Sequence, residues 1–284
     1  MRIALVQQRV TEDPKHNVAR AREAVRACAE RGAELVCLQE LFRTPYPADC
    51  EDPERWDWAE PIPGPTSEGM AALAGELGLV LVVPLFEKRA PGLYHNAALV
   101  FDADGSLAGH YRKMHLPDDP GFHEKFYFSP GDTGFRAFDT AAGRIGVAIC
   151  WDQWFPEAAR LLALDGASVL FYPSAIAWSE GESSEVRRAQ LDSWRTVQRG
   201  HAIANGVFVA AVNRVGRERA LDFWGSSFVC DPQGQVLAEA PGDDECSLVV
   251  DCPADRIEHQ RREWPLLRDR RIDAYADLTR RFRR

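Results

Sequence analysis

Short runs of apolar residues, each bounded by turn residues, recur along the whole chain. Such runs of strand length favour buried β-strands over helices where β-branched side chains are frequent and glycine or proline lies at the ends. The pattern predicts strands over residues 3–6, 35–38, 79–83, 97–101, 107–112, 145–149, 169–172, 207–212, 227–230 and 235–238.

The segments between these runs show the spacing of amphipathic helices. The pattern predicts helices over residues 14–31, 66–77, 156–165 and 185–205. Pro14 suits the first turn of the first helix, and Gly32 suits its end. Strands that alternate with helices indicate an α/β fold in which helices cover the faces of the sheets.

Two pairs of neighbouring strands are joined by turn sequences instead of helices. Residues 102–105 (DADG) and 231–234 (DPQG) are typical of hairpin turns, so the sheets are expected to be mixed. No stretch rich in proline, serine or glycine separates two halves. We therefore expect a single domain over residues 1–284, with a long surface loop over 48–65 and a C-terminal tail over 265–284.

Composition and charge exclude several classes of function. The 284 residues include 45% hydrophobic and 27% charged residues, which is typical of a soluble globular domain. The net charge of -9 argues against a nucleic-acid partner, which would need a basic face. No apolar run approaches the roughly 20 residues that span a bilayer, and the N-terminus lacks the pattern of a signal peptide, so we expect a cytoplasmic protein.

The cysteines and histidines do not predict a metal site. Seven cysteines with no CxxC pair argue against a disulfide framework or a zinc ribbon, and Cys28, Cys37 and Cys230 are interpreted as core residues. No histidines have the spacing of a metal motif, so His95, His115 and His201 are expected to be structural hydrogen-bonding groups. We expect neither a metal nor a cofactor.

Three reactive side chains each follow a predicted strand, in the order Glu, Lys, Cys. Cys150 could act as a nucleophile, Glu40 as a base for its thiol, and Lys113 as a cation that stabilises an oxyanion. Each has a structural alternative: core packing for the cysteine and an exposed charge for the other two. The shared position favours chemistry, because side chains at strand ends can meet at one edge of a sheet.

The segments around these residues, LQELF, YRKMHLP and GVAICWDQWFPE, resemble the three signatures of the nitrilase (carbon–nitrogen hydrolase) superfamily. The resemblance implies that Glu40 is the general base, Lys113 the oxyanion-stabilising lysine and Cys150 the nucleophile. It also implies that Glu124, in GFHEKFYF, orients the lysine or the substrate nitrogen.

The resemblance also carries expectations about fold and assembly. It implies a four-layer αββα sandwich of two mixed sheets, which pairs into a homodimer or a larger homo-oligomer. The tail over 265–284 is expected to contact the partner subunit.

Further segments, over residues 120–132, 150–160, 198–202 and 213–216, resemble N-carbamoylputrescine amidases within this superfamily. The resemblance implies hydrolysis of N-carbamoylputrescine to putrescine, CO₂ and ammonia in polyamine biosynthesis. Relatives that act on N-carbamoyl amino acids are similar to one another in having arginines just after the catalytic cysteine. Here these positions read Trp-Asp-Gln-Trp, which favours a cationic or neutral substrate tail over an anionic one.

Candidate substrate-binding residues follow from the same comparison. A carboxylate could bind the distal ammonium, and aromatic rings could pack on the methylene chain or face the cation. The candidates are Trp151, Asp152, Tyr46, Glu180 and Trp178, and a structural role is open for each. Alternative functions are an ω-amidase, a β-ureidopropionase-like enzyme, a papain-like hydrolase and a non-enzymatic binder of small molecules. A papain-like hydrolase is disfavoured, because the residues around Cys150 do not match the sequence that surrounds the catalytic cysteine of such enzymes.

Overall fold

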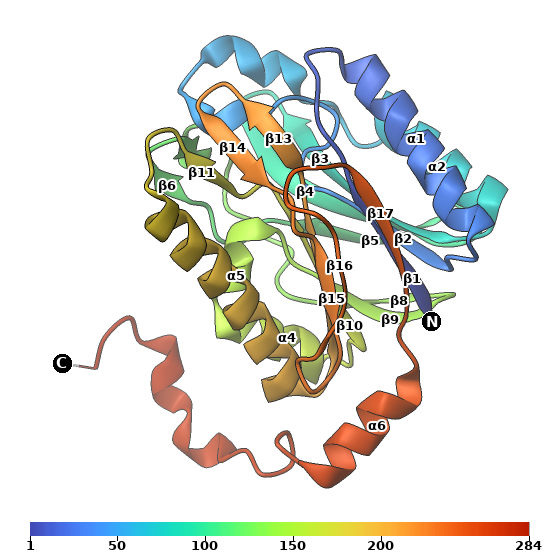
Figure 1. Ribbon diagram of the computed structural model, residues 1–284, viewed down its shortest axis with the longest axis vertical. Helices are drawn as coiled ribbons and strands as arrows, with labels where there is room; N and C mark the ends of the chain where they lie inside the picture. Colours follow the sequence, from blue (N-terminus) through green and yellow to red (C-terminus); the bar gives the residue numbers. More distant parts are fainter. Residues whose placement is uncertain (284) are drawn as a thin grey trace.

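The predicted apolar runs form strands of two six-stranded sheets that pack face to face, in a computed structural model that describes residues 1–283 (Figure 1). The strand order of the first sheet is β17-β1-β2-β3-β4-β5. Its strands are β1 (Arg2–Gln7), β2 (Leu35–Leu38), β3 (Val80–Ala90), β4 (Leu93–Phe101), β5 (Leu107–Arg112) and β17 (Cys246–Asp251).

The second sheet has the order β16-β15-β12-β10-β9-β8. Its strands are β8 (Ala137–Thr140), β9 (Gly143–Val147), β10 (Val169–Ser174), β12 (Phe208–Asn213), β15 (Phe228–Cys230) and β16 (Val236–Glu239). Parallel pairs at the centre of each sheet and antiparallel pairs at the edges make both sheets mixed, as predicted.

Two smaller sheets lie outside the sandwich. One contains β11 (Ala177–Ser179), β14 (Leu221–Trp224) and β13 (Val215–Glu218), and the other pairs β6 (Asp118–Asp119) with β7 (Phe122–His123). The helices are α1 (Pro14–Glu30), α2 (Pro65–Leu77), α3 (Glu124–Tyr127), α4 (Pro156–Leu164), α5 (Ser184–Asn205) and α6 (Ala254–Glu263). Short 3₁₀ helices are η1 (Pro47–Asp49), η2 (Pro53–Trp58), η3 (Cys150–Trp154), η4 (Ile272–Ala274) and η5 (Ala276–Thr279).

Strand periodicity sorts the buried side chains into layers. In β2, Val36 and Leu38 pack with the apolar faces of α1 and α2, whereas Leu35 and Cys37 point to the other sheet, because successive residues of a strand face opposite sides. Helices α4 and α5 cover the outer face of the second sheet (Figure 1). The expected four-layer αββα sandwich is confirmed.

Local capping sets the helix boundaries close to their predicted positions. The Asp13 side chain accepts hydrogen bonds from the main-chain N–H groups of Lys15 and His16, and Pro14 occupies the first turn of α1. At the end of α2, Gly78 adopts a left-handed conformation with φ 64°, which costs glycine little.

Two sequence expectations need correction. The strand before Cys150 ends at Val147, and the thiol belongs to η3, because the backbone turns sharply there. Residues 48–65 are not simply a surface loop, because η1 and η2 form within them and the side chains of Ala48 and Arg55 are buried.

The topology brings the ends of β2 and β5 to one edge. Strand β3 runs parallel to β2, β4 runs antiparallel to β3, and β5 runs antiparallel to β4, so β2 and β5 point the same way. Glu40 and Lys113 therefore leave the same edge of the first sheet, and the second sheet faces them with the turn at Cys150.

Gly131 has no room for a side chain, which gives a test of the packing beside Lys113. Its N–H donates a hydrogen bond to the Lys113 carbonyl, and a Cβ would lie 2.0 Å from the carbonyl oxygen of Arg112. We expect Gly131→Ala to lower the free energy of unfolding by about 2 kcal/mol, measured by urea denaturation. Gly200→Ala in α5, where nothing lies within 4 Å, is the control and should be neutral or stabilising. Equal effects of the two substitutions would contradict this account.

Candidate active site

Glu40 lies in a turn directly after β2, and its side chain is fully buried. Its Oε1 atom accepts hydrogen bonds from Asn96 Nδ2 at 2.6 Å and from Lys113 Nζ at 2.9 Å. Within residues 1–283, its Oε2 atom has no hydrogen-bond partner. One oxygen of the carboxylate is thus fixed by the protein, and the other is free to accept a proton.

Lys113 follows β5 and links two buried carboxylates. Its Nζ atom lies 2.9 Å from Glu40 Oε1 and 2.7 Å from Glu124 Oε1. Glu124 begins the short helix α3, and its Oε1 atom also accepts a hydrogen bond from the hydroxyl of Tyr46 at 2.8 Å. The predicted Glu40, Lys113 and Glu124 therefore form one connected group, together with the candidate Tyr46.

Cys150 is the first residue of η3 and has a strained backbone, with φ 42°. A non-glycine residue in this region costs about 1–3 kcal/mol, and such strain is frequent at functional sites. The thiol is 5% exposed. The charges of Glu40, Lys113 and Glu124 all act on the pKa of this thiol, so the sulfur lies within range of the charged group around Lys113.

Burial and neighbouring charges keep the thiol neutral and the lysine charged. Burial and the charge of Glu40 raise the pKa of the Cys150 thiol well above its ordinary value, while Lys113 and a hydrogen bond from the Ala175 main chain act in the opposite direction. Burial alone would lower the pKa of Lys113, but Glu124 and Glu40 outweigh it and raise this pKa. At neutral pH the site therefore holds a protonated thiol and a charged lysine.

Glu124 titrates near neutrality. Burial raises the pKa of its carboxyl from 4.5 to about 7, because Lys113 offsets only part of the desolvation and the charge of Glu40 adds to it. Two carboxylates that share one ammonium cannot both remain charged without a cost.

The Asp152 carboxylate, two residues after the thiol, is hydrogen-bonded to groups of the protein through both of its oxygens. Its Oδ2 atom accepts from the Tyr111 hydroxyl at 2.6 Å and from the Ile149 N–H at 2.9 Å, and its Oδ1 atom accepts from the His115 N–H at 3.0 Å. The side chain is fully buried. Of the two roles left open for Asp152, this geometry favours the structural one, and a contact with the substrate stays a prediction for it.

The other candidate ligands lie in different surroundings. Trp151 is half-buried beside Cys150, and its N–H at the start of η3 has no acceptor within that turn. Trp178 donates its indole N–H to the Arg187 carbonyl, and the guanidinium of that arginine lies over its ring. Glu180 is exposed and pairs with Arg217 at 2.6 Å, so a contact with the substrate remains a prediction for it.

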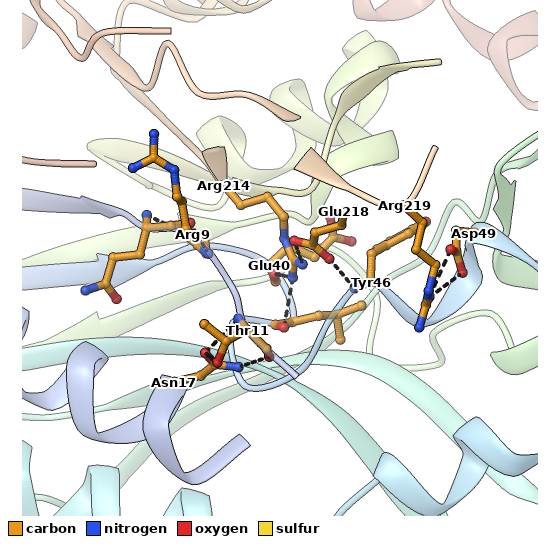
Figure 2. Close-up of polar contacts among 12 residues, drawn as sticks. Arg9, Thr11, Asn17, Glu40, Tyr46, Asp49, Arg214, Glu218 and Arg219 are labelled. Atoms are coloured by element: carbon orange, nitrogen blue, oxygen red, sulfur yellow. Dashed lines mark hydrogen bonds and ion pairs between the residues drawn. The ribbon is translucent and has the colours of Figure 1, made fainter. Parts of the chain in front are cut away.

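Sequence reasoning missed several residues that support the site. Asn96 donates a hydrogen bond to the Glu40 carboxylate. Arg214, which lies beside Glu40 in Figure 2, donates hydrogen bonds to the main-chain oxygens of Glu40 and Leu41. A signal existed for both: Asn96 is a polar residue that precedes an apolar run, and Arg214 lies within the segment 213–216 that resembled the family. The Ala175 amide left no signal, because main-chain donors have no side-chain identity.

The predicted histidine roles are confirmed. His95, His115 and His201 each make a hydrogen bond to a carbonyl or carboxylate oxygen, at 2.9, 2.7 and 2.7 Å. In the part of the chain that the structure describes, no group of three or more His, Cys, Asp or Glu residues is placed to hold a metal ion. No helix among residues 1–283 has both the length and the apolar character needed to cross a bilayer.

The family model described as "Carbon-nitrogen hydrolase" matches residues 2–262. The chain belongs to the carbon–nitrogen hydrolase family. This membership confirms the resemblance drawn from the three motifs, and it identifies the protein as an enzyme that hydrolyses carbon–nitrogen bonds of the amide type.

Individual members of the carbon–nitrogen hydrolase family are similar over nearly the whole chain. The N-carbamoylputrescine amidase of Solanum lycopersicum is 45% identical and covers 97% of this chain and 94% of its own length. The crystal structure of a carbon–nitrogen hydrolase from Helicobacter pylori G27 superposes with a TM-score of 0.97 at 45% identity, over 100% of this chain and 99% of that one.

The chain is also similar to the structure of an amidase with a modified cysteine. An amidase variant from Nesterenkonia sp. AN1, 28% identical with a TM-score of 0.76 over 96% of this chain and 94% of that one, carries the acetamide moiety of fluoroacetamide added covalently at its active-site cysteine.

The raised pKa of Glu124 predicts a dependence of stability on pH. The folded protein holds this proton up to about pH 7, whereas the unfolded chain releases it near pH 4.5, so the folded state binds more protons in this window. Stability contributed by this group is complete at low pH and is lost as the pH rises through the window. We expect the free energy of unfolding of Glu124→Gln to rise relative to wild type between pH 5 and pH 7.5. A constant difference in urea titrations would contradict the raised pKa.

Proposed function

We propose that the protein hydrolyses the ureido C–N bond of N-carbamoylputrescine and yields putrescine, CO₂ and ammonia, in polyamine biosynthesis. The observation that carries this proposal is the Lys113 ammonium, held at 2.9 and 2.7 Å by two buried carboxylates beside the Cys150 thiol. The 45% identity to a plant N-carbamoylputrescine amidase supports the choice of substrate.

The first half of the proposed reaction forms a covalent intermediate. Glu40 removes the thiol proton as the sulfur attacks the ureido carbon, because a buried thiol with a raised pKa needs a base at the moment of attack. The Lys113 ammonium and the N–H of Trp151 stabilise the resulting oxyanion. The C–N bond then breaks, the departing nitrogen takes the proton from Glu40, and a carbamoyl or alkylcarbamoyl thioester remains on Cys150.

The second half releases the acyl group. Glu40 removes a proton from a water molecule as the water oxygen attacks the thioester carbon. The sulfur then leaves and regains a proton. The carbamic acid that forms decomposes to CO₂ and the remaining amine or ammonia. The same carboxylate thus serves as base in both halves, which fits a group with one oxygen held by Asn96 and Lys113 and the other free.

The surroundings of the thiol support a substrate without an anionic tail. After Cys150, Trp151 is aromatic, Asp152 is hydrogen-bonded internally, and the Gln153 amide oxygen accepts a hydrogen bond from the Trp194 indole. None of these side chains can form the bidentate contact with a carboxylate that an arginine would provide. Tyr46, at the site, and Trp178 and Glu180, on the β11 segment, remain the proposed ligands of the methylene chain and distal amine.

Substrate preference tests this proposal directly. We expect kcat/KM for N-carbamoylputrescine to exceed that for N-carbamoyl-β-alanine by about tenfold or more, measured as ammonia release. Turnover of the carboxylate substrate at the higher rate would favour the β-ureidopropionase-like alternative, and faster turnover of ω-amides would favour an ω-amidase. Cys150→Ser should lower kcat about 1,000-fold or more, because the hydroxyl is far harder to ionise than the thiol.

We also propose that the chain forms a homodimer or a larger homo-oligomer through its C-terminal segment. Figure 1 shows this segment running from α6 beside α4 and α5 without joining either main sheet. Together with α4 and α5, its residues line a cavity of about 250 Å³. Large apolar side chains lie exposed on it: Trp264, Leu266, Ile272, Leu278 and Phe282. Residues 264–283 thus offer a partner copy an apolar surface that water covers in the isolated chain.

Aspartate substitutions on this surface test the proposed assembly. We expect Ile272→Asp combined with Leu278→Asp to shift the sedimentation coefficient from that of a dimer or larger species to that of a monomer, because two carboxylates would be desolvated in the interface. Leu107→Asp, at an exposed apolar position on β5, serves as the control and should leave the assembly unchanged. A wild-type protein that sediments as a monomer would overturn the proposal.

A cytoplasmic location is the remaining part of the proposed function. All seven cysteines are free, and such thiols persist most readily in a reducing compartment.

A further inference from the structure

Arg214, between β12 and β13, is a fully buried cation that does not touch the reactive side chains. Its Nη2 atom donates hydrogen bonds to the carbonyl oxygens of Glu40 at 2.8 Å and Leu41 at 2.9 Å (Figure 2). Its guanidinium also lies 5.1 Å from the centre of the Phe223 ring. The contacts with residues 40 and 41 go to the main chain, so Arg214 acts on the turn that carries the Glu40 carboxylate.

The same guanidinium also contacts, through Glu218, the far end of the segment 40–46 that begins at Glu40. Nη1 of Arg214 lies 2.7 Å from Glu218 Oε1, and Glu218 Oε2 accepts a hydrogen bond from the N–H of Tyr46 at 2.8 Å (Figure 2). One buried ion pair therefore holds both ends of the segment 40–46. The two side chains that this segment sends to the site, those of Glu40 and Tyr46, meet around Lys113 and Glu124.

The turn after Glu40 requires such support. Leu41 has φ 49°, a left-handed conformation that is unfavourable for a leucine and costs about 1–2 kcal/mol. The carbonyl oxygens on either side of this strained residue point to the interior, where a carbonyl without a donor would add a further cost. Arg214 satisfies both oxygens with one planar group, and Glu218 neutralises the charge that this requires.

We propose that Arg214 and Glu218 form a single positioning unit that holds the segment 40–46 in its strained conformation, so that the Glu40 carboxylate and the Tyr46 hydroxyl converge on Lys113. This inference rests on the proposed role of Glu40 as the general base. Both residues act through the main chain of this segment, so we expect their main contribution to the rate of the chemical steps through Glu40, with a smaller effect on substrate affinity through Tyr46.

Substitutions at the two ends of the ion pair test the unit. Arg214→Lys keeps the charge but lacks the planar fork that reaches two carbonyls and a carboxylate together. We expect it to lower kcat for N-carbamoylputrescine by about 10- to 100-fold while KM changes less than about threefold, because a displacement of about 1 Å of a reacting group costs about 100-fold. Glu218→Gln retains an acceptor for the Tyr46 N–H but not the charge, and we expect a smaller loss in the same direction.

The control is the neighbouring ion pair on the same hairpin. Arg219, at the turn between β13 and β14, pairs with Asp49 at 2.9 Å, and its side chain is 40% exposed (Figure 2). Asp49 sends no group to the site, so Arg219→Ala should leave kcat within about twofold of wild type. This variant separates a general loosening of the hairpin from the loss of the contacts at residues 40, 41 and 46.

Rates are divided by the folded fraction, measured by near-ultraviolet circular dichroism, so that loss of folded protein is not counted as loss of kcat. The double variant Arg214→Lys, Glu218→Gln should lose little more than Arg214→Lys alone, because two members of one unit do not contribute independently. If Arg214→Lys does not fold, the kcat and KM of Glu218→Gln decide the question.

Three outcomes would overturn the inference. They are an unchanged kcat of the folded Arg214→Lys or Glu218→Gln protein, a change confined to KM, and an equal loss in Arg219→Ala. Failure of the proposed function is a separate result, because the wild-type protein itself would then release no ammonia from N-carbamoylputrescine.

Discussion

The contact of one lysine ammonium with two buried carboxylates is the interaction on which the site depends. Each of these charges would be costly alone in the interior, and removing one partner of such a group leaves an uncompensated charge. Lys113 follows β5, Glu40 follows β2 and Glu124 begins α3, so the group requires three separate parts of the chain to be in place. The folded sandwich and the charge arrangement are thus mutually dependent.

Desolvation also determines how the chemistry can proceed. In water a cysteine is partly ionised near neutral pH, but burial raises the pKa of the Cys150 thiol, and the nearby lysine does not compensate fully. The proposed nucleophile is therefore neutral at rest. In the proposed mechanism, proton transfer accompanies attack, which fits a carboxylate with a free oxygen and an ammonium that stays charged in both halves of the reaction.

Local sequence could predict the parts of the site that follow from strand ends. Glu40, Lys113 and Cys150 stand just past apolar runs, and the sheet topology brings such positions together. Arg214 could not be placed in the same way, because it contacts residues about 170 positions earlier in the chain and its hydrogen bonds go to main-chain oxygens. The hydrogen bonding of Asp152 within the protein could not be predicted either, because a carboxylate after a proposed nucleophile suggests a substrate ligand until its partners are known.

Two turns with left-handed backbone carry the chemistry, and a buried charge supports each one. At Leu41 the Arg214 guanidinium binds the carbonyls on either side of the strain. At Cys150 the Asp152 carboxylate accepts the N–H of Ile149, just before the strained residue, and is itself held by Tyr111 and His115. A cation donates hydrogen bonds to carbonyls that lie outside the hydrogen bonding of helices and strands, and an anion accepts one from an amide that lies outside it. The sign of each charge therefore follows from which main-chain groups its turn leaves outside that bonding. Strain of this kind persists only where the surroundings over-determine it. The proposed base and the proposed nucleophile are therefore each held by a buried charge that satisfies main-chain groups of a strained turn, a cation at Glu40 and an anion at Cys150, one from each sheet of the sandwich.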